Sequence, residues 1–188
     1  MRKESVQDGE LARRAQGGDR DAFGELVARY AGQARRVAAS VLGNPDDADD
    51  AAQDGFLSAL RNIDRYDPMR PFGPWLMRIV ANAAADRRRR LKVRRADELS
   101  PAAAGSGPSP AVVTDRRAFG VALQRALAAL PERQRTAVVL FDVEGYTHAE
   151  IAGILGIPAG TVRSDVFHAR RALRDLLKDW KGWKESDP

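Results

Sequence analysis

Apolar residues recur at every third or fourth position along most of this chain, which is the spacing of a helix buried on one face. The first long stripe follows Asp19, a residue suited to capping a helix, and comprises Phe23, Leu26, Val27, Tyr30, Ala34, Val37, Ala38 and Val41. A later stripe comprises Phe72, Leu76, Ile79, Val80 and Ala83. Few β-branched or aromatic residues alternate with polar ones, as they do in strands. The pattern therefore predicts an all-α fold.

Interruptions of this pattern divide the chain. Gly43-Asn44-Pro45 should end the first long helix. Asn44 followed by Pro45 is the favoured order of a cap residue and a first helical proline, so we expect another helix to begin there. Residues 96–114 (ADELSPAAAGSGPSPAVVT) have no periodicity and are rich in Ala, Gly, Ser and Pro, which is the composition of a flexible linker. We therefore expect two small helical domains, residues 1–95 and residues 115–188, joined by this linker.

Residues 145–177 have the pattern of two helices joined by a tight turn. Thr147 and Glu150 have the spacing of a capping box, in which each side chain bonds the backbone N–H of the other residue. Gly156 tolerates a positive φ and Pro158 prevents smooth continuation, so the first helix should end between Glu150 and Pro158. A second helix then opens near residue 160.

The second helix has two unlike faces. Its apolar face comprises Val162, Val166, Ala169 and Leu173. Its free face comprises Arg163, Ser164, Asp165, Phe167, His168, Arg170, Arg171 and Arg174. The cap, the tight turn and the basic outer face together predict a DNA-binding helix-turn-helix. The alternative is an ordinary helical hairpin whose charged face is solvated.

Composition narrows the class of protein further. With 188 residues, of which 44% are apolar, the chain can bury real cores in one or two small domains. It has no cysteine, which excludes disulfides and thiolate metal sites, and only His148 and His168 offer imidazoles. We find no nucleophile–base pair and no phosphate-binding glycine loop, so we expect neither enzymatic activity nor a cofactor. The sequence has no signal peptide or long apolar run, and we expect a cytoplasmic protein.

Basic residues outnumber acidic ones by 31 to 26, and they are unevenly placed. A patchy basic protein suits a polyanionic partner. The run RRRRLKVRR at residues 87–95 contains more bases than a helix C-terminus needs. It predicts a face that follows DNA phosphates, with a solvated tail as the alternative.

Acidic residues gather at the start of the third predicted helix: Asp46, Asp47, Asp49, Asp50 and Asp54. The helix dipole explains acids in a first turn. It does not explain why Asp47, Asp50 and Asp54 share a face with Gln53. A metal site is the enzyme-type alternative, but Ala48 occupies a ligand position of the calcium-loop pattern. We therefore predict no metal site.

Four motifs in this order resemble those of the extracytoplasmic-function sigma factors, the smallest class of bacterial RNA polymerase sigma factors. They are DAAQDGF at 50–56, FGPWLMRIVANAAADRRRR at 72–90, LPERQRTAVVL at 130–140 and THAEIAGILGIPAGTVRS at 147–164. The resemblance covers residues 9 to about 178. It implies a factor without catalytic activity that brings core polymerase to a two-part promoter and helps to melt it. A stand-alone helix-turn-helix regulator is the alternative, although it gives the first domain no role.

The resemblance also implies partners and site residues. Asp50, Gln53 and Asp54 match the segment that docks on the clamp of the largest polymerase subunit, and Asp54 replaces the Glu of many relatives. The residues that match the minus-ten reader are Tyr66, Asn82, Arg87, Arg88 and Arg90. The implied partners are the polymerase core, through its clamp and its flap, promoter DNA and an anti-sigma factor, with no membrane insertion.

The residues that match the minus-thirty-five reader are Arg163, Ser164, Asp165, Phe167, His168, Arg170 and Arg171. Asp165 and His168 depart from the resemblance, because relatives usually have basic residues there. We expect Asp165 to face the major groove, where it could read a base, or else to pair with a nearby Arg such as Arg163. Among the aromatic residues, we interpret Phe72 and Trp75 as core and Tyr66 as the one free to meet DNA.

Overall fold

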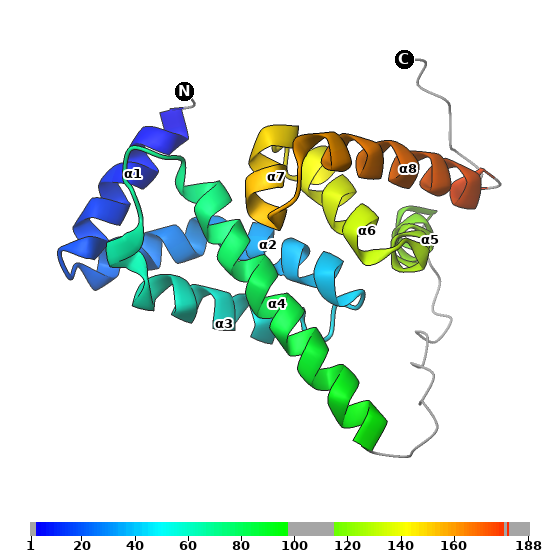
Figure 1. Ribbon diagram of the computed structural model, residues 1–188, viewed down its shortest axis with the longest axis horizontal. Coiled ribbons are helices and arrows are strands. Elements are labelled where there is room, and N and C mark those ends of the chain that lie inside the picture. Colours follow the sequence, from blue (N-terminus) through cyan, green and yellow to red (C-terminus); the bar gives the residue numbers. More distant parts are fainter. Residues whose placement is uncertain (1–2, 98–114, 179, 181–188) are drawn as a thin grey trace.

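The computed structural model describes the backbone of residues 3–97, 115–178 and 180, and the side chains of 7–94, 118–178 and 180. Every regular element in these ranges is helical, which confirms the all-α prediction (Figure 1). The α-helices are α1 (Lys3–Gln16), α2 (Arg20–Leu42), α3 (Ala48–Arg61), α4 (Phe72–Asp97), α5 (Asp115–Ala129), α6 (Glu132–Val138), α7 (His148–Leu155) and α8 (Ala159–Leu177). The short elements are the 3₁₀-helix η1 (Ile63–Arg65) and the π-helical turn η2 (Val139–Val143).

Most of the expected linker, 98–114, lies outside the described residues, as does most of the chain beyond residue 178. Among the described helices, none is both long enough and apolar enough to span a membrane.

The first group of helices is α1 to α4, in which α2, α3 and α4 pack on one another and α1 lies along α2. Asp19 caps α2 by accepting two backbone hydrogen bonds, at 3.1 and 3.0 Å. Gly43, at a φ of 83°, ends α2 in the left-handed conformation. The side chain of Asn44 accepts bonds from the N–H groups of Asp46 and Asp47. Helix α3 begins only at Ala48, with Asp47 as its N-cap, so the start expected at Asn44-Pro45 is three residues too early.

Helices α3 and α4 approach closely because Gly55 has no side chain. A Cβ atom at this position would lie 2.8 Å from Val80 Cγ2 and 3.0 Å from Val80 Cα, which is closer than packed atoms come. Ala51 and Ala59 are buried on the same side of α3. Small residues thus allow α3 to pack closely on α4, and the opposite side of α3 faces solvent.

Aromatic rings fix the segment that leads into α4. Tyr66, Phe72 and Trp75 contact one another with centroid distances of 5.2, 5.1 and 5.4 Å. Tyr30 of α2 lies 5.6 Å from Phe72. On the other side, Gln16 of α1 donates a 2.8 Å hydrogen bond to the carbonyl of Tyr66. The loop before α4 is therefore held between α1 and α2.

The second group is α5 to α8, of which α7 and α8 form the predicted helix-turn-helix. The capping box is present: Thr147 Oγ1 accepts from the N–H of Glu150 at 3.3 Å, and Glu150 Oε2 accepts from the N–H of Thr147 at 2.8 Å. Gly156 ends α7 at a φ of 68°. Helices α5 and α6 pack against α8 and complete the group.

The two groups of helices pack against each other. Helix α4 lies beside α7, and α2 lies beside α6 (Figure 1). The apolar core is continuous across this contact, and includes Val41 and Ala81 of the first group with Leu140, Ile151 and Ile154 of the second.

Candidate nucleic-acid interface

Helix α8 presents an exposed face on the outside of the helix-turn-helix. Its inner side is anchored by buried Val162, Val166 and Ala169. The exposed residues on its free face include Arg163, Ser164, Phe167, His168, Arg170 and Arg171. Phe167 is 63% exposed although it is a large apolar residue, and it lies against the ring of His168 at a centroid distance of 5.5 Å. A rigid helix with an exposed ring among guanidinium groups can contact both bases and phosphates.

Arg170 is the member of this face with the most intramolecular contacts. Its guanidinium pairs with Asp142 of η2. The same group lies 5.1 Å from the ring centroid of Phe141, a cation–π contact. The ion pair raises the pKa of Arg170, so its charge is secure. These contacts orient Arg170 before any DNA is bound.

The expectation that Asp165 faces the groove is wrong. The residue is only 3% exposed, and its carboxylate accepts hydrogen bonds from Arg133 of α6, with Nε at 2.6 Å and Nη2 at 3.2 Å. Hydrogen bonding to Asp165 raises the pKa of Arg133. The alternative, pairing with an arginine, has the right chemistry, but the partner is Arg133 and not Arg163. Asp165 lies three positions after Val162, which belongs to the apolar face, and residues three apart share a helix face. This spacing was the sequence signal that Asp165 points inward.

Asn82 lies exposed on α4, as expected for the minus-ten reader. It lines a groove of about 400 Å³ between α3 and α4, together with Arg90 and Asp86 of α4 and Asp54 and Arg61 of α3. The groove combines an amide, which can donate and accept, with two guanidinium and two carboxylate groups. It therefore offers hydrogen-bond donors and acceptors of both charges, as a base edge requires.

Two of the arginines expected to hold phosphates form intramolecular ion pairs. Arg87 Nη2 lies 2.9 Å from Asp47 and 2.7 Å from Asp50, so it joins α4 to the acidic end of α3. Arg88 pairs with Glu132 of α6. Of the three predicted arginines, Arg90 has no acidic partner within the described part of the chain, and its Nε donates to a carbonyl at 3.4 Å.

The expectation that Tyr66 is free is also wrong. The residue is 3% exposed, and its hydroxyl donates to the carbonyl of Arg70. Burial raises the pKa of Tyr66 to about 12, so the hydroxyl stays a donor. The apolar residue that does project from this loop is Met69, which is 88% exposed. The position of Met69 between Pro68 and Pro71 was a sequence signal for an exposed apolar residue in this loop, and we did not use it.

The acidic face of α3 is where the sequence places it. Gln53 and Asp54 are exposed, and Asp50 is exposed while it pairs with Arg87. Leu57, one turn beyond Gln53, is also exposed, so the face has an apolar component that the sequence analysis missed. Within the described residues no group of three or more His, Asp or Glu side chains could hold a metal ion.

Comparison with known proteins identifies the class. The family model for Sigma-70 region 2 matches residues 26–94, and the model for Sigma-70, region 4 matches residues 120–173. These matches coincide with the two groups of helices and define a two-region sigma factor.

Curated relatives make the family more specific. The chain is 41% identical to the ECF RNA polymerase sigma factor SigM of Mycobacterium tuberculosis, over 90% of this chain and 84% of the relative. It is 35% identical to the ECF RNA polymerase sigma factor SigW of Bacillus subtilis, over 86% of this chain and 92% of the relative. The chain belongs to the extracytoplasmic-function (ECF) RNA polymerase sigma factors. It acts in transcription initiation by directing bacterial RNA polymerase to promoters, which it recognises and melts.

Two solved structures share this fold. CnrH in complex with the cytosolic domain of CnrY has a TM-score of 0.65 and 32% identity, covering 92% of this chain and 97% of that one. The sigma factor RpoE from Bartonella quintana, in complex with the anti-sigma factor NepR, has a TM-score of 0.67 and 26% identity, covering 85% of this chain and 98% of that one.

Proposed function

We propose that this sigma factor divides its work among three exposed faces. The exposed face of α3 docks on the clamp of the largest polymerase subunit, the groove beside Asn82 and the loop before α4 read and open the minus-ten element, and α8 reads the minus-thirty-five element. The corresponding domains are residues 1–95 and residues 115–188, with 96–114 as the connection between them. The single observation that carries this proposal is the exposure of these faces on helices that are otherwise buried against one another.

For α8, the proposal rests on chemistry that fits the major groove. Arg163 and Arg171 are exposed and suited to phosphate or guanine, and Ser164 can donate or accept. The ring of Phe167 can contact a thymine methyl group. His168 stands where relatives usually have a basic residue. We therefore expect this position to contribute less to binding of the DNA phosphates.

For the minus-ten element, the proposal combines Asn82 and Arg90 with the rigid loop before α4. Opening a duplex costs a few kcal/mol for each unstacked step, and apolar side chains such as Met are used as wedges. Met69 is exposed on a loop braced by Tyr66, and its N–H donates to Asp67 at 3.0 Å. A wedge on a fixed base loses little entropy when it inserts. Tyr66 thus supports the loop and does not itself meet DNA.

We further propose two protein partners besides the clamp. The flap of core polymerase is the expected contact of the second group of helices. An anti-sigma factor is the expected inhibitor, because CnrH and RpoE, which share this fold, were both solved in complex with a partner protein. Neither partner requires a membrane-spanning segment in this chain.

The docking proposal predicts that Gln53→Ala combined with Asp54→Lys weakens binding to core polymerase by about tenfold, equivalent to about 1.4 kcal/mol. Both side chains are exposed and make no contact that the fold needs, so the helical circular-dichroism signal should not change. Titration of labelled chain with core polymerase measures the affinity. Asp64→Lys makes the same charge change at an exposed site on η1 and serves as the control. If the double variant binds core as tightly as this control does, the clamp assignment is wrong.

A further inference from the structure

Helix α1 lies along the loop that carries Met69, which comprises residues 66–71 (Figure 1). The side-chain amide of Gln16 donates to the carbonyl of Ile63 at 2.9 Å and to the carbonyl of Tyr66 at 2.8 Å. Ile63 is the first residue of η1 and Tyr66 follows its last residue, so these carbonyls lie where the chain enters the loop. One side chain of α1 therefore fixes the backbone on which the loop begins.

A second contact lies about two turns earlier on the same side of α1. Gly9 is seven residues before Gln16, and a Cβ atom added to Gly9 would lie 3.2 Å from the carbonyl oxygen of Pro68. Such a distance is tighter than most packed Cβ atoms show, so the backbone of α1 lies directly against the middle of the loop. Pro68 is the residue next to Met69. The two contacts thus hold the loop at its start and beside its exposed apolar residue.

Helix α1 is itself tied to α2. Asp8 is 2% exposed, and its carboxylate pairs with Arg29 and accepts a 2.7 Å hydrogen bond from the hydroxyl of Tyr30. Burial, together with this hydrogen bond, raises the pKa of Tyr30, so the hydroxyl remains a donor. Near the C-terminal end of α1, Arg14 Nε donates to Asp19, the residue that caps α2, at 2.9 Å. A helix fixed at two points is a stable support for the segment that it contacts.

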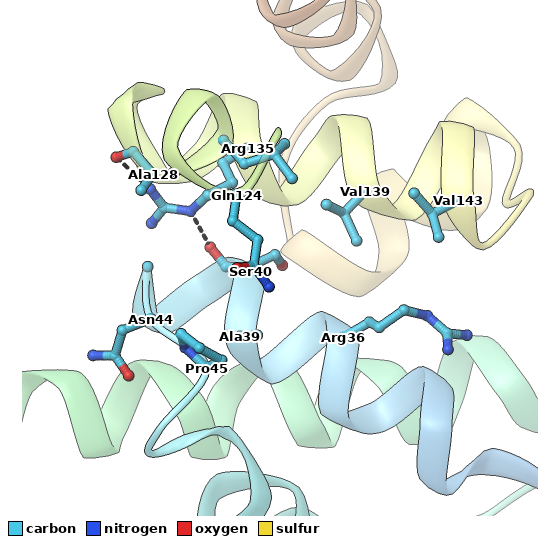
Figure 2. Close-up of a pocket in the computed structure, with 12 residues that line it drawn as sticks. Arg36, Ala39, Ser40, Asn44, Pro45, Gln124, Ala128, Arg135, Val139 and Val143 are labelled. Carbon is cyan, nitrogen blue, oxygen red and sulfur yellow. Dashed lines mark hydrogen bonds between the residues drawn. The ribbon is translucent and has the colours of Figure 1, made fainter. Parts of the chain in front are cut away.

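The contacts of α1 described above are all made within the first group of helices. The second group meets α2 at its C-terminal end, where Arg135 Nε donates to the carbonyl of Ser40 at 2.5 Å (Figure 2). Ser40 lies ten residues beyond Tyr30, which is about 15 Å along the helix. The support of the loop by α1 therefore does not depend on where the second group lies.

Position matters for this loop because of what its apolar residue has to do. A wedge offsets the cost of unstacking only if it is already aimed at the base step when the duplex opens. The rings of Tyr66 and Phe72 fix the two ends of the loop, whereas Met69 lies between them and is 88% exposed. Without α1, the middle of the loop would lose the surface on which Pro68 rests. Each insertion of Met69 would then carry the entropy cost of ordering the loop.

We propose that α1 positions the loop of residues 66–71 for promoter opening, with Gln16 and Gly9 as positioning residues and Asp8 as the residue that fixes α1. This role rests on the proposed function, in which the loop takes part in opening the minus-ten region. Helix α1 precedes residues 26–94, the segment that the region 2 family model matches, so the role lies outside that segment. Gln16 and Gly9 act through the loop and do not contact DNA.

The opening of a promoter fragment by core polymerase and the full-length chain tests this role. Two forms of one fragment are compared: a fully paired duplex, and the same fragment with mismatches that leave the minus-ten region unpaired. Gln16→Ala removes both hydrogen bonds to the loop. We expect it to slow the opening of the duplex by about threefold to tenfold, the effect of losing roughly one net hydrogen bond. Its affinities for the unpaired fragment and for core polymerase should equal those of the parent chain. Chemical modification of unpaired bases over time measures opening.

Two further variants of glutamine residues make the result specific. Gln7→Ala makes the same substitution at an exposed site of α1 and should open the duplex as fast as the parent chain does. Gln16→Glu keeps the shape of the side chain, but an ionised carboxylate cannot donate to a carbonyl. It should therefore slow the opening of the duplex at least as much as Gln16→Ala does.

Gly9→Ala tests the second contact without removing either hydrogen bond of Gln16. The added Cβ atom pushes on the carbonyl of Pro68, and the loop must give by a few tenths of an ångström. We expect this variant, too, to slow the opening of the duplex and to bind the unpaired fragment normally. Gly24→Ala is the matched control, because its added Cβ atom meets nothing within 4 Å.

The positioning role of α1 is contradicted if Gln16→Ala opens the duplex at the parent rate. It is also contradicted if Gln16→Ala loses as much on the unpaired fragment as on the duplex, because a general loss of folding weakens both. Thermal unfolding of each variant measures that loss, and Gly9→Ala decides the question if Gln16→Ala does not fold. Met69→Ala tests the proposed function separately. If Met69→Ala slows opening and Gln16→Ala does not, the proposed function of the loop stands and the role of α1 fails; if Met69→Ala opens the duplex at the parent rate, Met69 is not the wedge.

Discussion

Replacing Asp165 with Arg should destabilise the helix-turn-helix and weaken promoter binding through α8. The substitution removes the buried carboxylate that Arg133 contacts at 2.6 Å and puts a second guanidinium in its place. Like charges in a buried site repel, and α8 must shift or unfold locally to separate them. On the proposal that α8 reads the minus-thirty-five element, a displaced α8 loses at least one base contact, and we expect the affinity for that element to fall by about tenfold, given about 1–3 kcal/mol for each contact. Thermal unfolding and a promoter-library selection at two salt concentrations measure both effects.

Two further variants separate the effect of the charge at residue 165 from the effect of side-chain shape and pairing. Asp165→Asn keeps the shape but not the charge, and we expect a smaller loss of stability. Arg133→Asp combined with Asp165→Arg exchanges the partners and should recover part of the stability lost in the single variant. The account of Asp165 as an inward-facing partner is contradicted if Asp165→Arg keeps its melting temperature and only changes the preferred base at one position.

Replacing Gly55 with Ala should lower the free energy of unfolding by about 1–3 kcal/mol, the usual cost of overpacking. The new Cβ would meet both the side chain and the backbone of Val80, at 2.8 and 3.0 Å, so moving one side chain cannot relieve the contact. Helices α3 and α4 would have to separate. Chemical denaturation followed by circular dichroism measures the change.

Gly24 offers a matched control within the same group of helices. It lies in α2, is exposed, and an added Cβ would meet nothing within 4 Å. Gly24→Ala should therefore raise the free energy of unfolding by about 0.5–1 kcal/mol, because alanine costs less chain entropy in a helix. Equal effects of the two substitutions would mean that the close contact of α3 with α4 is not rigid.

The features that the sequence predicted correctly are local ones. Helical periodicity, the cap by Asp19, the capping box of Thr147 and Glu150 and the left-handed Gly156 each depend on residues a few positions apart. Such local features can be predicted without knowing what the helix packs against. For this reason the all-α fold and the helix-turn-helix could be assigned from sequence.

The features that it missed depend on partners distant in the chain. Asp165 was placed outward because it is charged, but its partner Arg133 comes from another helix and lets the carboxylate turn inward. Arg87 was read as a phosphate ligand, although the acids that bind it belong to α3. Tyr66 lies in a loop, where no helical stripe indicates which way a ring points. The contact between the two groups of helices likewise has no signature in either group alone.

Reconstitution with bacterial core polymerase tests the central claim most directly. Core polymerase would be incubated with this chain and a library of promoter fragments, and the opened fragments would be sequenced after their unpaired bases had been chemically modified. We predict that core with the chain opens a subset of fragments that share two elements, near minus ten and minus thirty-five, and that neither component alone opens them. A chain that binds DNA through α8 by itself, but does not change which fragments core polymerase opens, would contradict the account and identify a stand-alone helix-turn-helix regulator.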